Sequence, residues 1–272
     1  MVPSLLTLPD GISKDEAIRG SYGYIPSPGV CIMFVALFAV TTLMQLVYSL
    51  YARQWLLLPT MVLAGAGETL GWSGRLWSSQ NIFAETPFIM QIAVLVLSPT
   101  PLLAVYFIIF GRLVQNLRPQ FSRLKPALYF RIFLSCDIVS LTVQAIGDGT
   151  ASSSATNEDI QRGIYIMLVG IIMQVVIILG FSAIAFEFLY RLNLGRPLRQ
   201  GSTFGVMDRR RKIGIYAVFF ATSWLFIRAV FRTVELADGW YGTVIHTQWL
   251  FDTFDAAMVV LALYTWNLFP AG

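Results

Sequence analysis

Charged residues are scarce in this chain of 272 residues. Lys, Arg, Asp and Glu make up 12% of it, about half the share found in an ordinary soluble domain, and the mean hydropathy is +0.67. So few polar groups cannot cover the surface of a water-soluble protein of this length. The scarcity excludes a soluble globular enzyme, a disordered chain and a nucleic-acid-binding protein.

Residues that hold metals, cofactors or disulfides are also rare. The chain has one histidine, His246, and two cysteines, Cys31 and Cys136, which lie in separate apolar runs. These are too few for a metal cluster or a disulfide framework. No G-x-x-x-x-G-K-[ST] phosphate-binding loop occurs. We therefore predict no metal, no cofactor and no ATP-binding domain.

Long apolar runs make up most of the chain. Seven of them, each close to the ~20 residues that span a bilayer, are separated by short polar stretches. They lack the two-residue alternation of a membrane β-barrel strand. Since only helices and closed barrels satisfy their backbone groups in lipid, the predicted fold is an all-α integral membrane bundle of seven transmembrane helices. The predicted spans are 28–50, 55–77, 86–113, 128–146, 163–189, 213–236 and 244–268.

The distribution of Lys and Arg predicts the orientation. Twelve of the 19 lie in the first, third and fifth loops, three in the N-terminal tail and even loops, and four inside the spans. Because cytoplasmic loops are enriched in Lys and Arg, we expect the N-terminus outside or in a lumen and the C-terminus in the cytoplasm. The predicted organisation is a tail at 1–26 without the features of a secretory signal, one domain at 27–268, and a cytoplasmic tail at 269–272.

Function has to be inferred from the polar residues inside the spans, where a charged group costs about 2.5–3.5 kcal/mol. In the second span, Glu68 and Arg75 lie two turns apart on one face, and Gly67 and Gly71 form a small-xxx-small pair that allows another helix to approach. In the third span, the Ser-Pro-Thr-Pro segment at 98–101 predicts a kink, which either shapes a cavity or serves packing alone.

The remaining polar residues lie in the fourth to seventh spans, and with the second-span pair we expect them to share one pocket. It would open outward or sideways among the second, fourth, sixth and seventh spans, with Asp137 and Gln174 as its floor. The spans hold six carboxylates and four arginines, so one or two acids need water, a proton or a cationic ligand. The competing reading is that each charge only pairs with a neighbouring helix. The predicted pocket residues are Glu68, Arg75, Asp137, Gln144, Gln174, Arg228, Arg232, Glu235, Asp252 and Asp255.

Three motifs carry a family resemblance. They are Glu68-x-x-Gly71-Trp72-x-x-Arg75, Asp137-x-x-Ser140-x-x-x-Gln144-x-x-Gly147 and Arg228-x-x-Phe231-Arg232-x-x-Glu235. In these motifs, and along the chain from about residue 24 to its end, the sequence resembles the fungal lipid-translocating exporter family. These are seven-span proteins linked to aminocholesterol resistance, sphingoid long-chain base resistance and porphyrin handling.

The resemblance implies a membrane protein of the plasma membrane or an internal membrane of a fungus, with all the pocket residues except Asp252 corresponding to polar residues of the family. The chain departs from the family at Trp72 and Phe231, where Tyr is usual, at Gln248, where an acid is usual, and at Asp252, where Tyr is usual. These departures bear on the substrate more than on the fold.

The implied function is translocation of amphipathic lipid-like molecules, such as sphingoid bases or sterol-like and porphyrin-like compounds, without ATP. We hypothesise that a substrate amine pairs with Glu68 or Asp255 in an acid-rich pocket while the chain stays in lipid. Two alternatives remain: a membrane-embedded enzyme, such as a terpene cyclase, that uses the carboxylates as general acids, and a seven-span lipid sensor. The predicted partners are the substrate and membrane lipids, and the sequence does not indicate an oligomeric state.

Overall fold

The computed structural model describes residues 24–81, 84–117, 119–153, 157–196, 209–239 and 242–268. The predicted tails, apart from residues 24–26, and residues 197–208 of the basic fifth loop lie outside these ranges. Within them the chain is helical, with connecting turns and without a strand.

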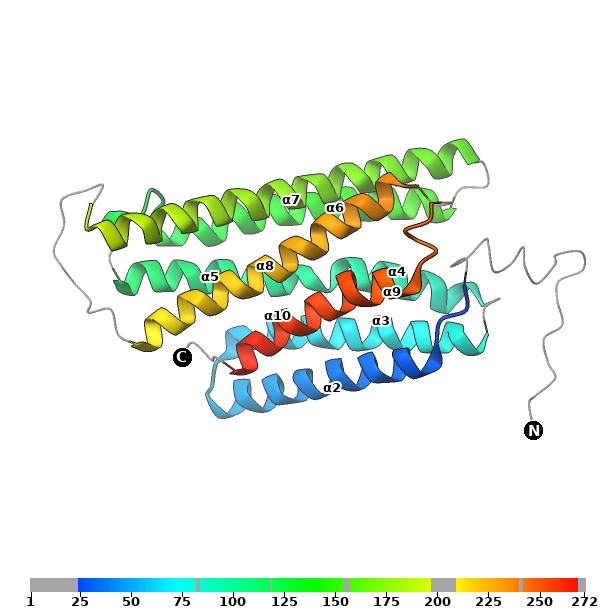
Figure 1. Ribbon diagram of the computed structural model, residues 1–272, viewed down its shortest axis with the longest axis horizontal. Helices are drawn as coiled ribbons and strands as arrows, with labels where there is room; N and C mark the ends of the chain where they lie inside the picture. Colours follow the sequence, from blue (N-terminus) through cyan, green and yellow to red (C-terminus); the bar gives the residue numbers. More distant parts are fainter. Residues whose placement is uncertain are drawn as a thin grey trace, which may run out of the picture.

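The described elements group into seven helical rods that lie alongside one another (Figure 1). The rod that contains α2 begins at the end of the bundle opposite to the end at which α10 finishes, as an odd number of rods requires. The first three rods are α2 (Pro28–Tyr51), η1–η2–α3 (Trp55–Leu57, Leu58–Val62, Leu63–Gln80) and α4–α5 (Glu85–Leu97, Pro99–Leu117). After the short turn η3 (Pro119–Phe121) come α6 (Pro126–Ser153), α7 (Asn157–Leu194), α8 (Arg209–Ala237) and α9–η4–α10 (Gln248–Phe251, Asp252–Ala256, Ala257–Leu268).

Five of the described helices are long and apolar enough to cross a membrane. The other two rods are interrupted by the π-helical turns η2 and η4 and carry charged side chains next to them. The all-α membrane class is therefore confirmed, whereas the count of seven crossings and the orientation of the termini stay predictions. The five candidate spans are Pro28–Tyr51, Thr86–Asn116, Pro126–Ala151, Glu158–Leu194 and Ile213–Ala237.

The outside of the bundle is apolar. Leu43 and Val47 on α2, and Val176 and Phe186 on α7, are each more than half exposed. A soluble monomer rarely exposes large continuous apolar surfaces, whereas lipid-facing helices need them. The surface therefore fits hydrocarbon on several sides.

Aromatic rings pack together in the interior near the beginning of α6 and the end of α7, and these two helix ends lie at the same end of the bundle (Figure 1). Neighbouring rings pack with centroid separations of 4.8–6.3 Å. Edge-to-face pairs of this kind each contribute about 0.5–1.5 kcal/mol beyond the burial of their area. We name this group the aromatic cluster; it consists of Phe107, Phe110, Tyr129, Phe133, Phe181 and Phe188.

Glycines allow α6 and α7 to pack at very short range. A Cβ atom at Gly163 would lie 2.8 Å from the Ala151 Cα, and one at Gly170 would lie 2.8 Å from the Ser140 carbonyl oxygen. Small residues at helix interfaces permit such close approach in membranes. The same device brings α3 against α4, because a Cβ atom at Gly71 would lie 2.5 Å from the Leu95 side chain and Gly67 faces Ser98. The close approach predicted for Gly67 and Gly71 is confirmed.

The third span is interrupted at the position where its prolines predict a kink. α4 ends at Leu97, Ser98 forms a turn, and α5 begins at Pro99. Proline has no N–H to donate to the carbonyl four residues earlier. The Leu95 carbonyl is therefore released from the helix and becomes available to another partner.

Several predicted ends differ from the structure, most of all those on either side of the fourth loop. α6 continues past residue 146 to Ser153, and α7 begins at Asn157 instead of residue 163. Glu158 and Asp159 in the first turn of α7 favour the helix N-terminus, and Arg162 pairs with both. In the last rod, residues 243–246 form turns, so the helix starts at Gln248 instead of residue 244.

Candidate functional site

A cavity of about 80 Å³ lies in the other half of the bundle, where its lining includes Tyr24, which precedes α2, and Glu235 and Leu236 at the end of α8. In this measure one buried water needs about 10–15 Å³. The cavity therefore accommodates several waters or a small polar headgroup, but not a whole long-chain lipid. Its wall combines polar and apolar side chains: Tyr24, Arg75, Phe88, Gln91, Ile92, Leu95, Val96, Gln144, Met167, Ile171, Gln174, Arg228, Ala229, Arg232, Glu235, Leu236, Ile245 and Phe251.

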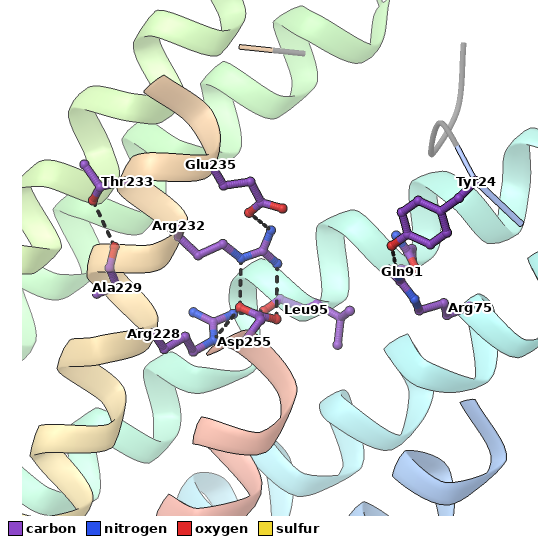
Figure 2. A network of polar contacts seen from close by, with 10 residues as sticks. All are labelled: Tyr24, Arg75, Gln91, Leu95, Arg228, Ala229, Arg232, Thr233, Glu235 and Asp255. Carbon is purple, nitrogen blue, oxygen red and sulfur yellow. Dashed lines mark hydrogen bonds and ion pairs between the residues drawn. The ribbon is translucent and has the colours of Figure 1, made fainter. Parts of the chain in front are cut away.

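Four charged residues form the ion cluster, which we define as Arg228, Arg232, Glu235 and Asp255 (Figure 2). One Asp255 oxygen, Oδ1, lies 3.0 Å from the Arg228 Nε and accepts a hydrogen bond from the Arg232 Nε at 2.9 Å. Arg232 also donates to Glu235 at 2.9 Å. Removing one partner of a buried pair leaves an uncompensated charge and costs about 3–5 kcal/mol. The cluster therefore fastens α8 to η4.

The released Leu95 carbonyl is the second partner of Arg228. The Arg228 Nη2 donates to it at 2.9 Å, across the interface between α8 and α4 (Figure 2). A hydrogen bond from a charged donor is worth about 1.5–3 kcal/mol. The proline at 99 thus creates an acceptor that the charged helix uses, and this bond holds the kinked rod against the cavity.

Arg75 reaches the cavity from α3, where it contacts amide, hydroxyl and aromatic groups. It donates to the Gln91 Oε1 at 3.4 Å and to the Tyr24 hydroxyl oxygen. Its guanidinium carbon lies 4.3 Å from the ring centroid of Phe251 and 5.3 Å from that of Trp72, within the range of cation–π attraction. Burial raises the pKa of Tyr24, which precedes α2, while the Arg75 charge opposes the rise. The Tyr24 hydroxyl therefore keeps its proton at neutral pH.

A network of side-chain hydrogen bonds joins α6 to α7. Gln174 donates to Asp137 at 3.4 Å, and Gln144 donates to the Gln174 Oε1 at 3.4 Å and to the Ser140 hydroxyl at 3.2 Å. The Ser140 hydroxyl in turn donates to the Gly170 carbonyl. Gln144 and Gln174 line the cavity, whereas Asp137 lies behind them. We name these five residues the amide network.

Glu68 differs from every residue of the ion cluster. Its side chain on α3 is 1% exposed, and within the described part of the chain it makes no hydrogen bond or ion pair. Its electrostatic neighbours are Arg228, Asp255 and Arg232. Glu68 is therefore a buried carboxyl group beside the ion cluster but outside its bonding.

The part of the chain that contains most of these site residues matches a known protein family. Residues 61–272 match the family model described as RTA1 like protein. The chain belongs to the RTA1-like family. It is an integral multi-pass membrane protein, as its apolar helices and its family require.

Three relatives of this RTA1-like chain from Saccharomyces cerevisiae carry functional or family names. It is 26% identical to the sphingoid long-chain base transporter RSB1 over 99% of its own length and 77% of that protein. It is 27% identical to protoporphyrin uptake protein 1, with 91% and 90% covered, and 26% identical to protein RTA1, with 92% and 84% covered. No solved structure matches the chain.

The structure brings together part of the pocket predicted for this RTA1-like chain. Six of the ten predicted residues line the cavity: Arg75, Gln144, Gln174, Arg228, Arg232 and Glu235. The other four, Glu68, Asp137, Asp252 and Asp255, are not part of the lining. Whether any of the ten acts on a substrate stays a prediction.

Two features of the predicted pocket are corrected. It was expected to be acid-rich, but Glu235 supplies the one carboxylate in the described lining, alongside three arginines. The acids lie behind because Asp255 is drawn toward Arg228 and Arg232, and Asp137 is held by Gln174. The pocket was also expected among the second, fourth, sixth and seventh spans, whereas α4 and α7 contribute much of its wall.

Sequence reasoning missed three contributors to the site. Gln91 is a lone polar residue in an apolar run, so its composition could have identified it. Tyr24 lies before the first span and reaches the site only because the chain folds back over α3. The Leu95 backbone carbonyl had a detectable signal, the proline four residues later.

Proposed function

We propose that this RTA1-like protein translocates amphipathic lipid-like molecules, with the polar headgroup in the cavity and the apolar part in the bilayer. The observation that carries the proposal is the size and lining of the cavity: about 80 Å³, with a wall that combines arginines and amides with apolar residues. The names of two relatives, a sphingoid base transporter and a protoporphyrin uptake protein, support the same class of substrate.

The headgroup would meet both donors and acceptors. The amides of Gln91, Gln144 and Gln174 each offer an acceptor oxygen and two N–H donors. The carboxylate of Glu235 is the lining group suited to an amine, so a sphingoid base would place its amine there and not directly at Glu68 or Asp255. A site of this kind accepts headgroups of several chemistries, such as hydroxyl, amine or carboxylate.

The apolar part would leave the cavity toward the bilayer. Ile92 and Val96 of α4 and Ile171 of α7 supply apolar wall beside the amides. Because the cavity is too small for a long chain, the tail must remain among the helices or in lipid. The headgroup would then move through the protein interior while the tail stays in lipid, so the protein would translocate the substrate without enclosing all of it.

The experiment is reconstitution of the purified protein in liposomes with labelled sphinganine, a sterol, protoporphyrin and an isoprenoid. A change of leaflet without a change of mass supports translocation. A change of mass indicates the membrane-embedded enzyme instead, and tight binding without either change indicates a sensor. Both of these results contradict the proposal.

A matched pair of variants on α8 tests the site. Ala229 is buried and lines the cavity, so Ala229→Leu fills much of it. Its neighbour Val230 is 38% exposed on the outer face, so Val230→Leu adds a carbon where lipid accommodates it. We expect the first variant to lose transport and the second to retain the wild-type rate. Equal rates in the two folded variants would show that the cavity is not the site.

A further inference from the structure

The ion cluster and Glu68 together hold unequal numbers of cationic and acidic groups. Arg228 and Arg232 face three carboxyl groups, those of Glu68, Glu235 and Asp255. Guanidinium groups stay charged in proteins, and a net charge in a low-dielectric interior is costly. One proton shared among the three acids balances the count.

The neighbouring elements do not supply a cation that would offset the surplus acid. α2 contains no Asp, Glu, Lys or Arg, α4 has Glu85 at its first position alone, and α5 has Arg112 near its end. The next charged groups are Arg75 on α3, Asp252 in η4, and Asp148 on α6, which interacts electrostatically with Arg232. They add one cation and two acids, so they do not compensate the surplus. The surplus acid is therefore a property of the ion cluster with Glu68.

Hydrogen bonding singles out Glu68 as the carboxyl group that holds the proton. Asp255 accepts hydrogen bonds from Arg232 and forms an ion pair with Arg228, and Glu235 accepts a hydrogen bond from Arg232. Glu68 has no such bond among the described residues, although it is almost completely buried beside Arg228. An ionised carboxylate in that position would need a donor, whereas a protonated one is neutral.

We propose that Glu68 is a proton-binding site that couples translocation to a proton gradient, and that its proton determines the partner of Arg228. With Glu68 protonated, Arg228 pairs with Asp255, as in the structure. When the Glu68 carboxyl releases H⁺ to water, its carboxylate becomes a second acceptor for Arg228, which then loosens its hold on Asp255. The coupling rests on the proposed function, whereas the proton site itself does not.

The position of Asp255 makes this exchange effective. Asp255 lies in the π-helical turn η4, between α9 and α10, and π-turns inside helices are frequent at functional sites. Arg228 lines the cavity and also holds the Leu95 carbonyl. A change in its partner would therefore alter the contact of α8 with η4 and reshape the cavity wall.

The first test detects the proton directly and needs no substrate. Infrared difference spectroscopy of the membrane-reconstituted protein compares the wild type with Glu68→Gln, which keeps shape and neutrality. We expect the carbonyl band of a protonated carboxylic acid to be lost in the variant, a difference that isolates Glu68 from Asp137 and all other acids. The control Glu187→Gln removes an acid that is paired with Arg123 and Arg191 and should not remove such a band. No band lost in folded Glu68→Gln would overturn the proposal.

The second test measures coupling in liposomes with the membrane potential clamped at zero. A one-for-one exchange with protons lets a gradient of one pH unit sustain about a tenfold substrate gradient. For a substrate that the liposome assay identifies, we expect the wild type to build up this tenfold substrate gradient. The control Glu187→Gln should build up the same gradient, whereas Glu68→Gln should only reach the passive distribution of the substrate. Accumulation by Glu68→Gln equal to the wild type would overturn the coupling. If the wild type moves no lipid, the proposed function fails and the infrared result alone decides the proton site.

Discussion

The interiors of the two halves of the bundle are packed with different kinds of side chain. At one end the aromatic cluster fills the space with rings whose centroids lie 4.8–6.3 Å apart. At the other end, buried charges and amides bond helix to helix around a cavity of about 80 Å³. Rings gain from contact alone, whereas buried polar groups need a specific partner for each donor and acceptor. The first half is suited to stability and closure, and the second to binding.

The largest expected effects come from one substitution in each half. Asp255→Asn removes the shared partner of Arg228 and Arg232, with a cost of about 3–5 kcal/mol. Phe181→Ala opens a void among Phe107, Phe110 and Phe133, also with a cost of about 3–5 kcal/mol. Thermal unfolding in detergent, followed by tryptophan fluorescence, measures both losses.

Ligand affinity separates the two variants. On the fraction that remains folded, we expect Phe181→Ala to bind sphinganine like the wild type and Asp255→Asn to bind it more weakly. The control Glu187→Gln breaks partly exposed ion pairs, which are worth about 0–1 kcal/mol. If Phe181→Ala weakened binding as much as Asp255→Asn, the division of the bundle into a stabilising and a binding half would be wrong.

A glycine pair on α7 gives the next largest effect. A Cβ atom at Gly170 would lie 2.6 Å from the Gln144 Cγ and 2.8 Å from the Ser140 carbonyl oxygen, so Gly170→Ala must push α6 away. Overpacking of this kind costs about 1–3 kcal/mol. At Gly180 on the same helix a Cβ atom would meet its nearest atom, on Phe133, at 4.0 Å.

The control Gly180→Ala should therefore be neutral or stabilise by up to about 1 kcal/mol, since alanine is the better helix former. Melting temperatures of the two variants check this contrast. We also expect Gly170→Ala to weaken ligand binding, because the displaced α6 carries Gln144 in the cavity wall. Similar melting temperatures would mean that α6 and α7 pack less tightly than the structure shows.

Local features of the fold were predictable from the sequence, because each depends on residues close in the chain. Apolar runs indicated the helices, the Ser98–Pro99 step indicated the kink, and Gly67 with Gly71 indicated a close helix approach. The end of α6 and the beginning of α7 were not, because both helices continue past their apolar runs, and acids in its first turn support the extension of α7. Hydropathy records the hydrocarbon boundary and not the end of the helix.

The composition of the site was predictable only in part, because pairing depends on distant residues. That Glu68 and Asp255 would lie near the same two arginines follows from the packing of α3 with α8 and η4, which lie far from α3 in the chain. Counting charged residues indicated that acids outnumber arginines. It could not indicate that most of these acids lie behind the arginines and outside the cavity lining. Gln91 and Tyr24 joined the site through the same long-range packing.

The smallest effect tests the link between the proline and the ion cluster. Pro99→Ala restores an N–H that competes with Arg228 for the Leu95 carbonyl. Arg228 then loses part of a charge-assisted bond worth about 1.5–3 kcal/mol, while the helix regains one worth about 0.5–1.5 kcal/mol. We expect a net destabilisation of about 1 kcal/mol by thermal unfolding, together with slower transport because the cavity wall straightens.

In the control Pro101→Ala the restored N–H meets the Leu97 carbonyl, and Leu97 is an exposed residue of α4. That variant should keep transport and be at least as stable as the wild type. If Pro99→Ala instead stabilised the protein as much as Pro101→Ala did, an ordinary helical hydrogen bond would fully replace the bond from Arg228 to Leu95.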